Sequence, residues 1–213
     1  MELKNEIRSF LDLCHLLHEK DLVSGPGGNV SFRHGDHILI TPSGRRLESL
    51  KEEDVVFLTS DGSFTSHNGG KPSKEWRMHL SCYSRDDIGA VIHVHSVYAM
   101  AISCLCSLDH LCAIPVYTPG YGTRVGKLPV ISYELPGSVE LAEKVAAVID
   151  KRNSVMMANH GVLTVGKTPE DALNLVEEIE EAAKMYFALT GQGRALSEEQ
   201  QAQLFPMGMR QPF

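Results

Sequence analysis

Two histidines, His93 and His95, lie one residue apart in the apolar segment V-I-H-V-H at residues 91–95. Side chains on a β-strand alternate between its faces, so both imidazoles would project to the same side, about one ladder step apart. Two imidazoles placed in this way can bind one metal ion. The alternative is a pair of core histidines satisfied by backbone groups, but the H-x-H spacing on a strand favours a metal site.

A third imidazole and a carboxylate stand at positions that could complete this site. His160 follows the apolar segment V-M-M-A and precedes Gly161, which lets the backbone turn tightly. Glu75 is expected in the first turn of a helix that begins at Pro72 and Ser73. Three imidazoles and one carboxylate suit zinc or a neighbouring divalent metal. Such a metal polarises a carbonyl or enolate oxygen while a nearby carboxylate moves protons, so the set indicates carbanion chemistry.

Two glycine-rich loops are candidates for binding phosphate. They read S-G-P-G-G-N at residues 24–29 and T-P-S-G at residues 41–44, and we expect them at the same end of the sheet. Successive backbone amides, together with a helix N-terminus at Ser73 and Lys74, would hold a phosphate without much net positive charge. Most glycine-rich turns are only turns, so this signal gains weight only beside the metal ligands.

Hydrophobic spacing and turn residues predict the elements that must position these residues. An amphipathic helix is expected at residues 3–19, followed by hairpins at 29–41 and 54–66. The later elements are a helix from Pro72, a strand at 90–95, a helix at 97–105, a connector at 115–129, a strand at 129–133, a helix at 138–151, strands at 154–158 and 162–165, and a helix at 169–189. Because hairpins are mixed with helices, we predict a three-layer α/β arrangement with a mixed, largely antiparallel sheet.

Composition limits the class of protein. A chain of 213 residues fits a single domain, residues 1–213, and its net charge of −7 disfavours nucleic-acid binding. No apolar run is long enough for a membrane span and no signal peptide is evident, so we expect a cytoplasmic protein that binds no membrane. The five cysteines, an odd number, are expected to be buried free thiols of a reducing compartment.

Five short segments, in order along the chain, resemble the class II aldolase and adducin head-domain superfamily, and most closely its fuculose-phosphate aldolases. Each segment alone is a weak signal, but the group is far more specific than any one of them. The matching segments are G-P-G-G-N-V-S at 25–31, I-T-P-S-G at 40–44, K-P-S-K-E-W at 71–76, H-V-H at 93–95 and N-H-G at 159–161.

The resemblance implies an αβα sandwich that assembles as a homotetramer, with active sites between subunits that take a phosphorylated sugar. It implies one divalent metal ion per subunit on His93, His95 and His160, usually zinc, with manganese and cobalt as alternatives. Glu75 would ligate the resting metal and then act as acid and base. The residues that would hold the substrate phosphate are Asn29, Ser43, Gly44, Ser73 and Lys74.

In the aldolase branch, cleavage passes through a metal-stabilised enediolate, and a tyrosine of a neighbouring subunit protonates the aldehyde oxygen. Tyr117 and Tyr121, in V-Y-T-P-G-Y-G, are the candidates for this tyrosine, with a purely packing role as the alternative. The implied reaction is cleavage of a ketose 1-phosphate, such as L-fuculose 1-phosphate or a 5-deoxypentulose 1-phosphate, to dihydroxyacetone phosphate and a short aldehyde.

Two departures from the fuculose-phosphate aldolases keep the reaction type open. Pro26 stands where those enzymes have a threonine, and Lys74 replaces the second serine of their P-S-S-E. P-S-K-E also resembles relatives that decarboxylate 3-oxo-tetronate 4-phosphates, and methylthioribulose 1-phosphate dehydratases share the three-histidine pattern, as alternatives beside an epimerase. A non-catalytic, adducin-like interaction module is disfavoured, because it would not need four intact ligands.

The C-terminal stretch from Gln200 is more apolar than a solvated tail should be. It is a candidate to fold over a neighbouring subunit, with Arg210 facing the substrate. The alternative is a merely packed or disordered terminus.

Overall fold

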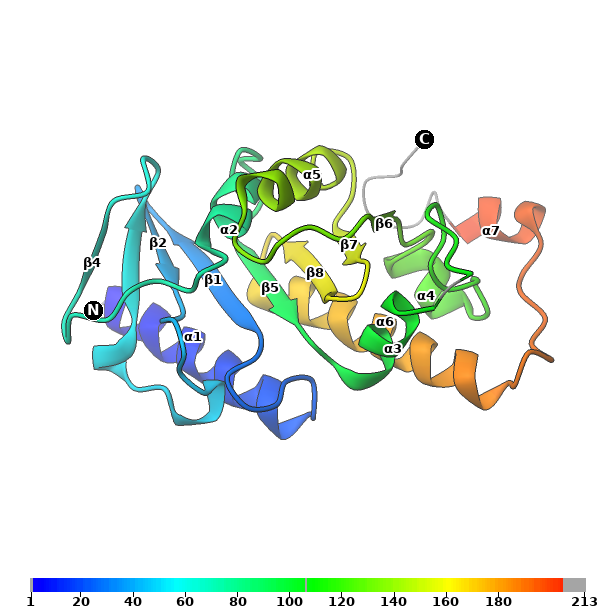
Figure 1. Cartoon of the computed structure of the whole chain (residues 1–213), viewed down its shortest axis with the longest axis horizontal. Helices are drawn as coiled ribbons and strands as arrows, with labels where there is room; N and C mark the ends of the chain where they lie inside the picture. The colour runs from blue at the N-terminus through cyan, green and yellow to red at the C-terminus, as the bar shows by residue number, and fades with distance from the viewer. Residues whose placement is uncertain (1, 106, 205–213) are drawn as a thin grey trace.

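The chain folds around one β-sheet with helices on both faces, in a computed structural model that describes residues 2–105 and 107–204 (Figure 1). The strands are β1 (Asn29–His34), β2 (His37–Ile40), β3 (Val56–Thr59), β4 (Phe64–Ser66), β5 (Ala90–Val94), β6 (Val130–Ile131), β7 (Ser154–Met157) and β8 (Gly161–Gly166). The α-helices are α1 (Glu2–Glu19), α2 (Trp76–Cys82), α3 (Val97–Ser103), α4 (Pro119–Arg124), α5 (Val139–Ile149), α6 (Pro169–Ala188) and α7 (Glu198–Leu204). Two short 3-10 helices, η1 (Leu47–Ser49) and η2 (Glu52–Asp54), precede β3.

The strands lie in the order β4-β3-β2-β1-β5-β8-β7-β6. Every neighbouring pair is antiparallel except β6 and β7, which are parallel. The expected mixed, largely antiparallel sheet is therefore confirmed. The strand that carries the H-x-H motif, β5, lies between β1 and β8, in the middle of the sheet rather than at its edge.

The two faces of the sheet carry separate hydrophobic cores, which confirms the three-layer arrangement. On one face, α1, α3 and α6 pack over a core that includes Phe10, Ile92 and Val94. On the other face, α2 and α5 cover a core that includes Met78 and Val91 (Figure 1). Because side chains alternate along β5, His93 shares the face of Val91 and points toward α2.

One predicted helix start was wrong, and tertiary contacts explain the difference. The helix expected from Pro72 begins at Trp76, and Glu75 is its N-cap residue rather than a first-turn residue. Upstream, Pro72 forms an isolated bridge with Pro42, and the Ser73 amide donates a hydrogen bond to the Thr41 carbonyl at 2.9 Å. This backbone pairing holds residues 72–73 extended, so the helix begins later in the sequence than expected.

The connector expected at residues 115–129 contains a helix that was not predicted, α4. Its N-terminus has the usual signals, since the Thr118 side chain accepts a hydrogen bond from the Tyr121 amide and Pro119 occupies the first turn. The helix is short and rich in glycine, and its stability therefore comes from packing on α6 and α7 rather than from intrinsic propensity.

At the C-terminal end, α7 follows an irregular segment and ends at Leu204. Arg210, the tail residue expected to face substrate, lies outside the described residues. Among the described helices, none is both long enough and apolar enough to cross a membrane.

Candidate metal centre

The three histidines and Glu75 come together, with one potential ligand atom from each lying within 4.8 Å of all the others. Val94 of β5 pairs with Val162 of β8, and this register places the end of one strand beside the start of the other. His95 therefore lies next to His160, and their ring centroids are 5.2 Å apart. Long-range strand pairing thus assembles ligands that are 65 residues apart in the sequence.

The contacts within this cluster suit a cation at its centre. His93 Nε2 lies 3.3 Å from Glu75 Oε2, and His160 Nε2 lies 3.2 Å from Glu75 Oε1. The Nε2 atoms of His93 and His95 are only 2.9 Å apart. Three ring nitrogens and a carboxylate thus converge on one small volume, a donor set that matches zinc and its divalent neighbours.

A second contact orients the central imidazole. His93 Nδ1 lies 2.9 Å from the carbonyl oxygen of Val162, and it donates its proton there. In the neutral ring, this leaves the lone pair of Nε2 directed into the cluster. His93 is fully buried, so the backbone of β8 fixes its tautomer as well as its position.

Burial and charge set the protonation states in the cluster. Burial raises the pKa of the Glu75 carboxyl, but the charge of His93 and polar contacts with His160, His93 and Asn29 outweigh burial and hold that pKa well below its usual range. Burial lowers the pKa of His95 to about 4, assisted by His93 and His160. For His93, burial is outweighed by the Glu75 carboxylate, which raises its pKa. Glu75 is therefore an anion and His95 a neutral ligand near pH 7.

Two glycines leave the room that the cluster needs. Gly161 has no space for a side chain, because a Cβ there would lie 2.5 Å from the Val94 carbonyl oxygen and 3.0 Å from His95 Cδ2. Gly28 adopts a positive φ of 77°, which favours glycine, and packs against the His93 carbonyl oxygen. The glycine-rich loop at 24–29 therefore lies against the H-x-H strand.

The residues predicted to hold phosphate lie on segments that pair beside the cluster. The Ser43 amide donates to the Lys71 carbonyl at 2.9 Å, which aligns residues 41–44 with residues 71–73. Ser73 is buried and its Oγ accepts a hydrogen bond from the Glu75 amide. Gly44 and Lys74 are exposed next to them. The loop at 24–29 precedes β1 and the loop at 41–44 follows β2, and because these strands are antiparallel both loops lie at one end of the sheet, as expected. The helix N-terminus lies at residues 75–76 and not at 73–74.

The side chain of Asn29 has different partners from those that the phosphate prediction suggests. Its Nδ2 donates to Glu75 Oε2 at 2.9 Å, and its Oδ1 lies 2.5 Å from His79 Nε2. His79 was not singled out from the sequence. The available signal was its spacing, because Glu75 and His79 stand four residues apart at the start of a helix, where side chains share a face.

Neither of the two candidate tyrosines belongs to the four-residue cluster. Tyr121 is 1% exposed in the core beneath α6, and burial raises the pKa of its phenol well above the usual value. Its hydroxyl cannot reach a bound substrate without local opening, so the structure favours the packing role for Tyr121. Tyr117 is half-buried and lies against Gly193, and burial and Tyr186 raise its pKa.

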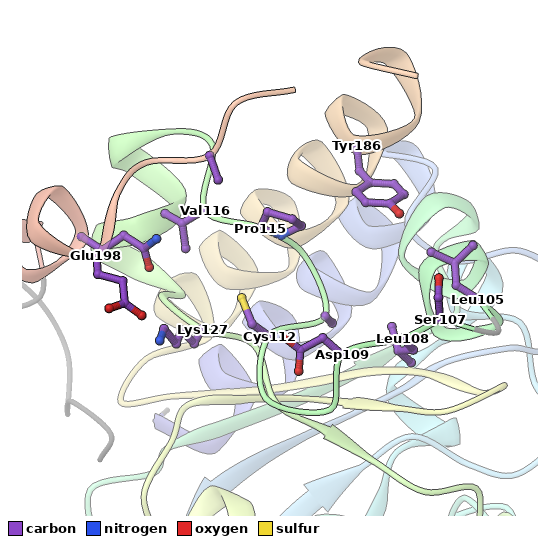
Figure 2. Close-up of a pocket in the computed structure, with 13 residues that line it drawn as sticks. Leu105, Ser107, Leu108, Asp109, Cys112, Pro115, Val116, Lys127, Tyr186 and Glu198 are labelled. Carbon is purple, nitrogen blue, oxygen red and sulfur yellow. The ribbon is translucent and has the colours of Figure 1, made fainter. Parts of the chain in front are cut away.

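A separate cavity opens between residues 107–116, α6 and α7 (Figure 2). Figure 2 shows Tyr186 of α6, Glu198 of α7, Cys112 and Lys127 among its lining side chains. None of the cluster residues, the predicted phosphate residues or the two tyrosines lines it. Burial and Asp109 raise the pKa of the Cys112 thiol, which therefore makes a poor nucleophile.

Comparison with known proteins shows the family to which this fold belongs. The sequence profile of the Class II Aldolase and Adducin N-terminal domain matches residues 8–187. The chain is 38% identical to an L-fuculose phosphate aldolase of Methanococcus maripaludis (strain C7) over 185 residues, which cover 86% of this chain and 97% of the relative. It is 40% identical to a 3-oxo-tetronate 4-phosphate decarboxylase of Haemophilus influenzae over 184 residues, covering 85% of this chain and 87% of the relative.

A solved structure is similar along almost its whole length. YgbL of Escherichia coli, for which an aldolase, epimerase or decarboxylase activity has been suggested, superposes with a TM-score of 0.91 at 30% identity, covering 96% of this chain and 99% of that one. The fold and the matching relatives define an α/β enzyme whose four-residue cluster is able to hold a metal ion. More narrowly, the chain belongs to the class II aldolase and adducin superfamily, and it is close to the fuculose-phosphate aldolases.

Proposed function

We propose that this protein is a metal-dependent lyase that cleaves a ketose 1-phosphate to dihydroxyacetone phosphate and a short aldehyde. L-fuculose 1-phosphate and 5-deoxypentulose 1-phosphates are the leading substrates. The observation that carries the proposal is the convergence of Glu75 with three imidazoles beside two loops suited to phosphate. The relatives named L-fuculose phosphate aldolase support it.

His93, His95 and His160 would hold the metal ion, with Glu75 as a fourth ligand that can leave. When bound, a divalent ion supplies a Lewis acid that polarises the substrate carbonyl and stabilises negative charge beside it. Zinc is the preferred ion, with manganese and cobalt as alternatives, because imidazole nitrogens suit all three.

Glu75 would move the proton at carbon. Cleavage breaks the bond between the carbon next to the ketone and the carbon that becomes the aldehyde, and the electron pair stays on the carbon next to the ketone. Protonation of that carbon completes dihydroxyacetone phosphate, and a carboxyl group beside the ketone can deliver the proton. Asn29 Nδ2 holds Glu75 Oε2, which leaves Oε1 on the side of His160 for this exchange.

Tyr117 would transfer the other proton. In cleavage it would take the proton of the hydroxyl group whose oxygen becomes the aldehyde oxygen, and in the reverse addition it would protonate that oxygen. Tyr117 contacts Gly193, lies near Tyr186 and is not one of the four cluster residues, so we expect it to serve the site of a neighbouring subunit. Exposed Val97, Tyr98 and Met100, on the helix that directly follows His95, also suit a subunit interface. We therefore retain the homotetramer with shared sites, and a cytoplasmic location, as parts of the proposal.

Decarboxylation is a second candidate, favoured by the 40% identity to the Haemophilus influenzae decarboxylase and by Lys74. Loss of carbon dioxide from a 3-oxo-tetronate 4-phosphate also leaves an electron pair on the carbon next to a ketone, and protonation there also gives dihydroxyacetone phosphate. The two reactions differ in one proton transfer. Aldol cleavage must remove a hydroxyl proton, whereas decarboxylation of the ionised acid need not.

The deciding experiment gives metal-loaded protein L-fuculose 1-phosphate, 5-deoxyribulose 1-phosphate and 3-oxo-tetronate 4-phosphate separately, with and without a chelator. Aldehyde release that the chelator abolishes would support the aldolase, and Tyr117→Phe should slow it about 10²-fold or more. Carbon dioxide without aldehyde, unaffected by Tyr117→Phe, would replace the aldolase with the decarboxylase. No turnover of any of the three would contradict both.

A further inference from the structure

A buried chain of hydrogen bonds leads away from Glu75 through four further side chains. Asn29 Nδ2 lies 2.9 Å from Glu75 Oε2, and Asn29 Oδ1 lies 2.5 Å from His79 Nε2. His79 Nδ1 lies 2.8 Å from Ser31 Oγ, which lies 2.8 Å from the Tyr83 hydroxyl. All five residues are buried. The chain joins β1 to α2 behind the candidate metal ligands, on the face of the sheet toward which His93 points.

When Glu75 is ionised and His79 is neutral, only one arrangement of protons satisfies every contact in this chain. A carboxylate can only accept, so Asn29 must turn its NH₂ group to Glu75 and its oxygen to His79. His79 must then carry its proton on Nε2, and its Nδ1 accepts from the Ser31 hydroxyl. Ser31 in turn accepts from Tyr83. Every hydrogen bond in the chain is therefore donated in the direction from Tyr83 toward Glu75.

The environment of His79 agrees with a neutral ring. His79 is fully buried, and burial, assisted by the charge of His93 and opposed by Glu75, lowers its pKa to about 3. A neutral imidazole has one donor and one acceptor nitrogen, which is what Asn29 and Ser31 require. Removing the ring would leave Asn29 Oδ1 buried without its donor, a state that proteins avoid.

We propose that His79 is a positioning residue for the reaction, because it fixes the orientation of the Asn29 amide and thereby that of the Glu75 carboxylate. This inference rests on the proposed function only in that Glu75 is taken as the group that moves the proton. An amide cannot pass a proton along this chain without becoming an imidic acid, so the chain orients Glu75 and does not conduct protons. Without His79, the amide can flip and present its oxygen to the carboxylate, where the two acceptors repel.

The proposal predicts a specific pattern among three variants of α2. His79→Leu should lower kcat about 10- to 100-fold and weaken zinc binding by up to the same factor, as loss of a partner behind a metal ligand does elsewhere. KM should change little, because the predicted phosphate loops stay intact. His79→Gln, whose amide can donate to Asn29, should recover much of the loss. Met78→Leu is the matched control, because Met78 is buried on the same helix but outside the hydrogen-bonded chain.

Zinc affinity is measured by competition with a chromophoric chelator, which does not depend on knowing the substrate. Kinetic measurements of Glu75→Gln in parallel distinguish the positioning role of His79 from the role of Glu75 in the proposed function. If Glu75→Gln remains fully active, the role of Glu75 in the proposed function fails. If Glu75→Gln is inactive but His79→Leu matches Met78→Leu in kcat and zinc affinity, the proposed function stands and the positioning role is overturned.

The wild-type protein provides a test that no folding defect can obscure. The ¹⁵N chemical shifts of the His79 ring should show a neutral imidazole protonated at Nε2, both with and without zinc. A ring protonated at Nδ1, or one that exchanges between tautomers, would overturn the proposal whatever the variants do.

Discussion

The candidate metal centre and the cavity beside α7 show two different ways in which a protein can present a site. The cavity is a hollow in the surface, lined by side chains such as Leu105, Cys112 and Tyr186. The metal centre is mostly buried, with His93 fully covered and Glu75 7% exposed. Its polar atoms converge on one point, with two imidazole nitrogens 2.9 Å apart, whereas the cavity has no comparable group of ligands among the described residues.

This difference indicates that the active site of this protein is better located by converging donor atoms than by the shape of the surface. Burying three imidazoles and a carboxylate is costly unless the groups bind something or each other. The cavity is lined by apolar side chains mixed with charged ones such as Asp109, Lys127 and Glu198, and among the described residues no group of metal-ligating side chains converges there. We therefore expect substitutions at the metal centre to affect activity strongly and those at the cavity to affect it weakly.

The largest effect is expected for Glu75→Gln. The amide retains the shape of the carboxyl group but cannot move a proton at neutral pH, so kcat should fall about 10²- to 10⁴-fold. Glu178→Gln, which removes a carboxylate paired with Arg124 on the surface of α6, is the control. Rates of the Glu75 variant within a few-fold of wild type would remove Glu75 from the chemistry.

Gly161→Ala tests whether the close packing of β5 and β8 builds the metal centre. The new methyl group would meet the Val94 carbonyl oxygen and His95, so the ligands must move. Metal affinity should fall about 10- to 100-fold, with a loss of about 1–3 kcal/mol in the free energy of unfolding. Metal titration and chemical denaturation measure these changes.

The control for this substitution is Gly120→Ala in α4. There the neighbours of an added methyl group are the ends of the flexible side chains of Glu178 and Arg124. Its metal affinity should equal that of wild type. Equal affinities in both glycine variants would show that the strand contact does not set the ligand positions.

Lys74→Ser tests where the phosphate binds. Lys74 is exposed beside the phosphate loops, so its charge should contribute only about 0.2–1 kcal/mol, or about a 1.4- to 5-fold change in KM, and less at high salt. Lys127→Ser in the cavity should leave KM unchanged. The reverse result, with KM raised only by Lys127→Ser, would move the phosphate to the cavity.

The smallest effect is expected for Cys112→Ala in the cavity. Its Sγ donates to the Ile114 carbonyl at 3.2 Å, and burial keeps the thiol protonated. We predict that kcat stays within about 2-fold of wild type, because the cavity lies outside the metal centre. Loss of a single weak neutral hydrogen bond should lower the free energy of unfolding by about 1 kcal/mol at most. A large loss of activity with normal folding would make the cavity part of the active site.

The four residues of the cluster could be predicted from the sequence because each carries a local signal. His93 and His95 follow the two-residue period of a strand, and His160 and Glu75 stand at element ends. Asn29 and His79 contact each other across 50 residues, and no local pattern specifies that pairing. The family resemblance supplied the predicted phosphate residues, but only the structure shows that the Asn29 amide is hydrogen-bonded to Glu75.

The elements of the fold were predicted where periodicity is strong and missed where tertiary contacts decide. The helices of residues 2–19 and 169–188 have long amphipathic patterns. The start of α2 was placed too early, because the bridge between Pro42 and Pro72 cannot be read from the sequence around Pro72. The short α4 had a Thr-Pro start signal, but its glycines argued for a loop.

The most direct measurement is the metal content of the purified protein after loading with zinc and removal of the excess. We predict about one ion per chain for wild type and for Cys112→Ala, and almost none for His93→Ala. A wild-type protein that retains no zinc, manganese or cobalt, or a His93→Ala variant that retains a full equivalent, would contradict the assignment of the metal centre.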